Sequence, residues 1–198
     1  MRILVVSDYY PPYYIGGYEL GCKDIVDRLA RKGHNVVVLT SIYGVNRVTV
    51  EGNVHRLLRL QQIPKINSYY KKLFKLANIG YKDNAIIREF IRRFHPDVIS
   101  VWHVSDLPMS ILASIENEGV PVVYTISDYW LKFIGQDEWL QFWSREPVSP
   151  IKRKVKNFLK SLLSNKVPTE VRNLNLKHAY FTSETLKRHH IEAGLPVR

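Results

Sequence analysis

The stretch RILVVSDYYPPYYIGGYELG (residues 2–21) contains the transition that decides the fold. It begins with an apolar, β-branched run, which predicts a strand at 2–8 that is buried on both faces. From residue 18 the apolar residues recur at helical spacing, and this predicts a helix at 18–32 that ends at Gly33. A strand, a loop and a helix in this order form the first unit of a doubly wound α/β domain.

The same alternation continues along the chain. Further strands are predicted at 35–41, 54–60, 97–102, 121–127 and 178–183, and further helices at 68–94, 106–118, 151–164 and 184–193. Segment 131–177 breaks this rhythm, so we interpret it as a long insertion rather than a second domain. The sequence therefore predicts one α/β domain over residues 1–198, with a doubly wound, mainly parallel sheet, right-handed crossovers and flanking helices.

Composition narrows the class of protein. With 198 residues, 45% of them apolar, the chain can bury a full core. No run approaches the roughly 18 apolar residues of a membrane-spanning helix, and we expect a cytoplasmic protein. The single Cys22 excludes an intramolecular disulfide, and its helical position predicts a core thiol. The net charge of +11 indicates an anionic partner or surface, with nucleic acid, anionic lipid and phosphorylated substrates all open.

The loop at 9–17 is the first candidate site. In a doubly wound sheet, ligands lie beyond the carboxyl ends of the strands, where the free N–H groups of a helix N-terminus favour anions. Gly16 and Gly17 fall at that junction, where glycine permits φ > 0 and the close approach of a phosphate or sugar ring. The alternative is an ordinary turn before a helix. The spacing of the glycines does not fit the GxGxxG fingerprint, and the chain has no P-loop, so a nicotinamide cofactor is not expected.

Three stretches together resemble a known family. Residues 7–41 (SDYYPPYYIGGYELGCKDIVDRLARKGHNVVVLTS) are similar to the opening of family 4 retaining glycosyltransferases of the GT-B fold. Residues 95–131, with HPDVIS and PVVYTISDYWL, resemble the later pair of strands, and 178–196 resemble the end of the N-terminal domain. The resemblance covers nearly the whole chain except 131–177.

This resemblance implies a Rossmann-like domain, the N-terminal, acceptor-side half of a GT-B enzyme. Such an enzyme moves a sugar from a nucleotide-sugar donor to a carbohydrate or lipid-linked acceptor with retention of configuration, without a protein nucleophile. The C-terminal nucleotide-binding domain of the family is absent from this chain, so we expect the chain alone to be inactive. We expect no cofactor and no metal, because the chain has neither an Asp-x-Asp pair nor a His/Cys cluster.

The resemblance also implies site residues. Gly16, Gly17 and Glu19 match the loop that faces the donor, and they are the predicted donor-binding residues. The predicted catalytic set is Asp128, Ser127 and His103. Many members have His before Asp at this strand end, where the chain has Ser127, and three interpretations stay open. Ser127 replaces the imidazole sterically, Asp128 contacts a sugar hydroxyl, or His103 reaches the cleft from the neighbouring strand instead of packing beside Trp102.

Aromatic residues give the predicted acceptor contacts, Tyr13, Tyr14 and Tyr129. We expect the four tyrosines of the loop, at 9, 10, 13 and 14, to be exposed, and to contact either an acceptor or another domain. A second aromatic set could stack on a sugar, but core packing is the favoured interpretation for it; it comprises Tyr129, Trp130, Trp139, Phe142 and Trp143.

Three other classes of protein are alternatives to this family. A nucleic-acid-binding module would use Lys71, Lys72 and Lys75 between aromatic residues, but no recognised motif supports it. A phosphoacceptor domain would need more acids than Asp8, and a nucleotide-sugar epimerase of GT-B form stays open. Finally, IKRKVKNFLKSLL (151–163) predicts a basic amphipathic helix that either lies on anionic lipid, at the inner face of the membrane, or packs its apolar stripe on the domain.

Overall fold

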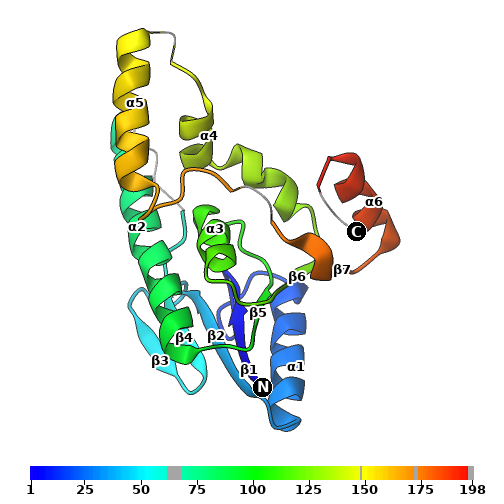
Figure 1. Cartoon of the computed structure of the whole chain (residues 1–198). Helices are drawn as coiled ribbons and strands as arrows, with labels where there is room; N and C mark the ends of the chain where they lie inside the picture. The colour runs from blue at the N-terminus through cyan, green and yellow to red at the C-terminus, as the bar shows by residue number, and fades with distance from the viewer. Residues whose placement is uncertain (62–67, 148, 172–173, 196–198) are drawn as a thin grey trace.

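The computed structural model describes residues 1–61, 68–147, 149–171 and 174–195, and these form an α/β domain around one sheet (Figure 1). Its strands are β1 (Arg2–Val6), β2 (Asn35–Ser41), β3 (Thr49–Glu51), β4 (Val54–Leu58), β5 (Val98–Val101), β6 (Val122–Ile126) and β7 (Ala179–Phe181). They lie in the order β3-β4-β2-β1-β5-β6-β7. Every pair is parallel except β3 with β4. Without β3 this is the strand order of a doubly wound Rossmann-like sheet, so the predicted fold class is confirmed.

The helices cover both faces of the sheet. They are α1 (Gly17–Arg31), α2 (Tyr69–Phe94), α3 (Ser110–Asn117), α4 (Glu138–Ser144), α5 (Pro150–Leu163) and α6 (Glu184–Glu192), with 3₁₀ turns at Trp130–Gln136 and Leu176–His178. Figure 1 shows α1 on one side of the sheet and α2 with α3 on the other. The structure adds β3, which was not predicted. It also shortens some predicted elements: β1 ends at Val6 rather than 8, β4 ends at Leu58 rather than 60, and α3 begins at Ser110 rather than 106.

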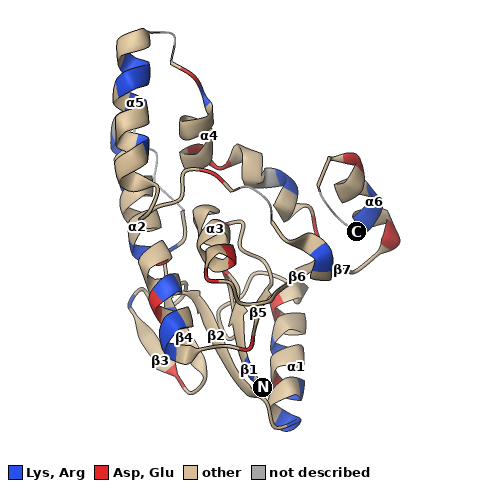
Figure 2. Cartoon of the chain, in the orientation of Figure 1, with Lys and Arg blue, Asp and Glu red and all other residues tan. Residues whose placement is uncertain are grey.

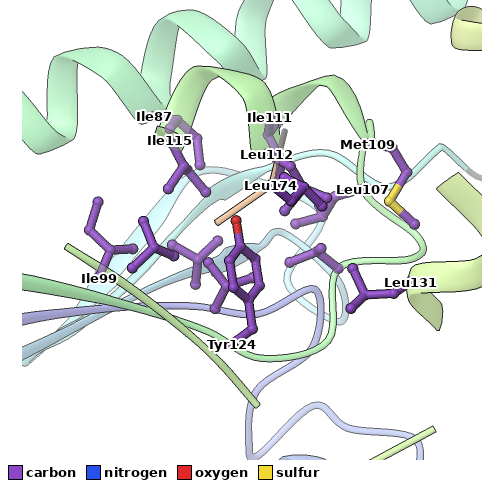
Figure 3. Packing of buried hydrophobic residues seen from close by; sticks show 14 of the residues in the cluster. Ile87, Ile99, Leu107, Met109, Ile111, Leu112, Ile115, Tyr124, Leu131 and Leu174 are labelled. Carbon is purple, nitrogen blue, oxygen red and sulfur yellow. The ribbon is translucent and has the colours of Figure 1, made fainter. Parts of the chain in front are cut away.

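Two apolar clusters fix these layers. On the α1 face, Cys22 and Val26 pack against Ile3, Val5 and Val38, so Cys22 is the core thiol that the sequence predicts. On the other face, side chains of α2 and α3 pack on the strands and meet Tyr124 of β6 (Figure 3). The alternation of Ile3 and Val5 with Leu4 and Val6 between the two clusters explains why β1 is apolar throughout.

Segment 131–177 lies between β6 and β7 and contains α4 and α5, with no strand among its described residues. Trp139 and Trp143 of this segment, and Trp130 just before it, are buried in the main cluster, which confirms core packing for these rings. By contrast, α5 has no buried residue, and Figure 1 shows it extending away from the sheet. None of the described helices is long and apolar enough to cross a membrane.

Candidate functional site

The site lies where the winding of the sheet reverses. β1 pairs with β2 on one side and β5 on the other, and the chain crosses over in opposite directions from this point. Ligands of doubly wound sheets bind at the carboxyl ends of the strands at such a point. Asp8, His103 and Asp128 lie two residues after the last residue of β1, β5 and β6, respectively. Parallel pairing of these strands therefore brings all three to the same edge.

The three side chains form one network centred on His103. Its Nδ1 lies 2.7 Å from Asp8 Oδ2, and its Nε2 lies 3.1 Å from Asp128 Oδ2. Asp8 is fully buried, the His103 side chain is 18% exposed and the Asp128 side chain is 50% exposed. The network therefore runs from the interior, through the imidazole, to a carboxylate that solvent or a ligand can reach.

Backbone amides hold both carboxylates in place. Asp8 accepts hydrogen bonds from the N–H of Tyr9 at 2.9 Å and from that of Asp106 at 3.3 Å. Asp128 Oδ1 accepts one from the N–H of Trp130 at 2.9 Å, at the start of the 3₁₀ turn. These bonds favour the charged form of each carboxylate and fix its position before any ligand arrives.

The network keeps His103 protonated at neutral pH. Burial of the ring lowers its pKa, but the hydrogen bonds and charges of Asp128 and Asp8 outweigh burial and raise the pKa to about 10. For Asp128, burial raises the pKa, whereas the hydrogen bonds from His103 and from the Trp130 N–H bring it below the ordinary value. Burial raises the pKa of Asp8, against the opposing effect of His103. The arrangement is thus an imidazolium between two carboxylates, one of them accessible.

The N-terminus of α1 adjoins this network. Tyr18, in the first turn, places its ring 5.6 Å from the His103 ring and donates a hydrogen bond to the Thr125 carbonyl oxygen at 2.5 Å. Glu19 is buried, and its Oε2 accepts the Gly16 N–H at 3.0 Å, so in this structure the carboxylate caps the helix. A contact of Glu19 with a donor stays a prediction.

The backbone of the glycine pair differs from the left-handed conformation that glycine would permit there. Neither Gly16 nor Gly17 has positive φ; Gly16 is extended, with φ −144°. A Cβ at Gly17 would meet nothing within 4 Å, so glycine is not required there by the protein's own packing. Both residues are exposed, and the open space beside them is what a close ligand would need.

The loop before α1 is more buried than expected. Tyr9 and Tyr10 are both buried, which contradicts their predicted exposure. The guanidinium of Arg56, in β4, is itself buried and donates to the Tyr10 carbonyl at 3.1 Å and the Pro11 carbonyl at 2.8 Å. Its carbon Cζ also lies 5.1 Å from the centre of the Tyr13 ring. Arg56 was not predicted as a site residue. The predicted strand 54–60 also contains His55 and Arg59, so nothing in the sequence distinguished the one arginine that is buried.

The predicted acceptor residues differ in their surroundings. Tyr13 is half-buried and packs on Arg56, whereas Tyr14 and Tyr129 are exposed. Tyr129 follows Asp128 directly, and its ring is stacked on His190 of α6, with the centroids 6.0 Å apart and the planes 10° apart. Ser127, which precedes Asp128, is half-buried. None of these positions tests an acceptor contact of the three tyrosines or a catalytic role of Ser127, so all four remain predictions.

A polar hollow lies beside the network. It has a volume of about 260 Å³, and Ser105, whose hydroxyl lies 3.3 Å from His103 Nε2, forms part of its wall. Lys72, which the nucleic-acid interpretation used, also lines it and forms an ion pair with Glu138. No group of three or more His, Cys, Asp or Glu that could hold a metal ion occurs among the described residues.

The fold and this edge define a doubly wound α/β domain with a polar site at the switch point. The chain belongs to Glycosyltransferase Family 4, whose model matches residues 15–197. The family that the sequence resembles is thereby confirmed. The match includes Gly16, Gly17, His103 and Asp128, although a family match by itself assigns no role to any of them.

A curated protein of known sequence is a distant relative of this chain. An uncharacterized 42.6 kDa protein in the cps region of Klebsiella pneumoniae is 25% identical over 140 residues, which are 66% of this chain and 38% of that protein. The chain therefore spans about two fifths of the length of this relative.

Solved structures are more distant still. The UDP-GlcNAc 2-epimerase of Methanocaldococcus jannaschii aligns with 98% of this chain and 43% of its own, at 8% identity and a TM-score of 0.49. A glycosyltransferase of Streptomyces sp. SF2575 aligns with 75% and 49%, at 15% identity and a TM-score of 0.42. Similarities this weak do not bear on activity.

Proposed function

We propose that this domain takes part in the transfer of a sugar from a nucleotide-sugar donor to a carbohydrate or lipid-linked acceptor. Membership of Glycosyltransferase Family 4 supports the class of reaction. The observation that carries the location of the site is the Asp8–His103–Asp128 network at the switch point of the sheet.

Asp128 is the residue that we assign to the sugar. Its side chain is half exposed, and its lowered pKa keeps it a carboxylate at neutral pH, so it can accept a hydrogen bond from a sugar hydroxyl. Ser127 precedes it and fills the position that an imidazole takes in many family members. The hollow beside Ser105 offers space for an acceptor next to the network.

His103 supplies fixed positive charge. Its imidazolium faces the edge where the N-terminus of α1 also directs partial positive charge, close to Gly16 and Gly17. Preorganised charge of this kind stabilises negative charge that grows on a departing phosphate. Asp8 is a positioning residue in this proposal, because it is buried and acts on a ligand only through His103.

Transfer with retention completes the proposal. The bond from the anomeric carbon to the phosphate oxygen breaks, and the bond to the acceptor oxygen forms on the same face. The acceptor's proton passes to the departing phosphate oxygen, so a protein nucleophile is not needed. No metal or other cofactor takes part in the proposed reaction.

Titration of nucleotide sugars into the labelled chain, followed by NMR of the histidine rings, tests this proposal. We expect millimolar binding, about −4 kcal/mol, with the His103 signals shifted. Gly17→Ala should weaken binding about tenfold, because a methyl group enters the space beside the α1 N-terminus. Gly21→Ala is the matched control, since a Cβ there also meets nothing within 4 Å but lies one turn further along α1.

Two results would contradict the proposal. Binding that leaves the His103 signals unmoved and is equally strong in both glycine variants would place the ligand elsewhere. If no nucleotide sugar bound, the domain would contain no part of the donor site. Micromolar binding would instead overturn the expectation that this chain holds only the acceptor-side half of the site.

A further inference from the structure

Helix α5 is oriented with its apolar side outward. The residues Ile151, Val155, Phe158, Leu159 and Leu162 share one side of the helix at 3.6 residues per turn, and we call them the outer stripe. Each of them is between 42% and 75% exposed. Of the two interpretations that the sequence left open, packing of this stripe on the domain is therefore wrong, because its members cover no part of the core.

The other side of α5 attaches the helix to the protein. Lys156 Nζ donates to the Arg145 carbonyl oxygen and lies 5.1 Å from the centre of the Phe142 ring. Lys160 Nζ lies 3.3 Å from Glu170 Oε2. Leu163 packs against the main apolar cluster. A polar hollow of about 480 Å³ also lies on this side of the helix. These contacts determine which side faces solvent.

The charge around the outer stripe indicates which kind of partner would bind it. Lys152 and Lys154 border the stripe on its two edges, both are exposed, and residues 151–164 contain no acid. Figure 2 shows the blue bands along α5 with no red among them. Two copies of this chain that met through their stripes would bring like charges together, which disfavours self-association. An apolar stripe with basic edges fits anionic lipid, where the stripe enters the acyl boundary and the lysines meet phosphate groups.

We propose that α5 docks this protein on the surface of an anionic membrane, with the outer stripe in the lipid and Lys152 and Lys154 at the headgroups. The contact needs no change in the fold, because the stripe is already exposed. It is independent of the proposed sugar transfer, since α5 contributes nothing to the network around His103.

Two fluorescent labels on α5 measure the contact directly. Cys22 is fully buried, so a cysteine introduced at an exposed position is the one that an environment-sensitive dye labels. With Val155→Cys the dye replaces a stripe residue, and with Asn157→Cys it lies on the opposite side of the same turn. Vesicles of phosphatidylcholine with phosphatidylglycerol should shift the emission of the first label to the blue and leave the second nearly unchanged.

Co-sedimentation with the same vesicles supplies the second measurement. The double variant Val155→Ser/Phe158→Ser should lower the partition coefficient for vesicles about tenfold or more, because two apolar side chains no longer enter the lipid. Lys152→Glu/Lys154→Glu should lower it about tenfold on anionic vesicles. Val48→Ser/Val50→Ser is the matched control, because each valine is 57% exposed, which is similar to the stripe residues, and neither belongs to α5: Val50 lies in β3 and Val48 just before it.

Three outcomes would overturn the proposal. Equal binding to vesicles of pure phosphatidylcholine would show that the lysines do not select anionic lipid. No binding to either kind of vesicle would show that α5 does not dock on a membrane. A blue shift of the Val155 label without lipid, growing with protein concentration, would assign the stripe to a second copy of the chain.

Discussion

The edge of the sheet at His103 and the helix α5 both depart from the rule that apolar groups are inside and charges outside. At the sheet edge, an imidazolium lies 2.7 Å from a buried carboxylate and 3.1 Å from a half-exposed one. On α5, five large apolar side chains are exposed. Burial of a charge is tolerated only with a partner, whereas exposure of an apolar stripe requires no partner within the fold. The charges of the first region are therefore paired within the fold, whereas the stripe of the second has no partner among the described residues.

Replacement of His103 gives the largest expected effect and tests the first region. In the folded chain its pKa is raised to about 10, so the stabilisation is fully present below about pH 6.5 and is lost as the pH rises toward 10. His103→Gln should lower the free energy of unfolding by about 2–4 kcal/mol at pH 6 and by much less at pH 9.5. Urea unfolding at both pH values measures this. The exposed His178→Gln is the control, and a loss for His103→Gln that is equal at both pH values would show that the network is not charged as described.

The loop beside the network can be tested through glycine. Gly44 has φ +81°, and a Cβ there would lie 2.2 Å from Tyr13 Cδ1, whereas Gly33 has φ +83° and nothing within 4 Å. Both alanine variants carry the cost of the left-handed backbone, about 1 kcal/mol, but only Gly44→Ala also displaces the Tyr13 ring. We therefore expect a loss of about 2–3 kcal/mol for Gly44→Ala and about 1 kcal/mol for Gly33→Ala in thermal or urea unfolding. Equal losses would mean that the Tyr13 ring moves freely, unlike the rest of this edge.

The two regions also differ in what the sequence could predict. Apolar runs and helical periodicity predicted the core strands, because burial on both faces requires such runs. The network was predicted only in part: Asp128 and His103 came from the family resemblance and from strand ends, while Asp8 was considered only for another chemistry. Asp8 and His103 are 95 residues apart, and parallel pairing of β1 with β5 is what joins them. Nothing local to either residue specifies that pairing.

For α5, the sequence predicted the local features but not the orientation of the helix. Its periodicity predicted the helix, its stripe and its basic residues correctly, since these depend on spacing alone. Which side of the helix turns inward depends on partners outside the helix, such as the Arg145 carbonyl and Glu170. The sequence left both orientations open. Contacts of lysines with a carbonyl, an aromatic ring and an acid hold the polar side inward.

Adjacent leucines at the end of α5 provide the prediction with the smallest effect. Leu162 belongs to the outer stripe and is 56% exposed, while Leu163 is half-buried and packs against the main cluster. Leu162→Ala should change the free energy of unfolding by less than about 0.5 kcal/mol, as for other exposed sites, and Leu163→Ala should lower it by about 1–2 kcal/mol. Both residues are leucines of the same helix, so the difference in helix propensity between leucine and alanine cancels from the comparison. If Leu162→Ala were the more costly of the two in urea unfolding, α5 would present its apolar side to the protein, and the contrast between the two regions would fail.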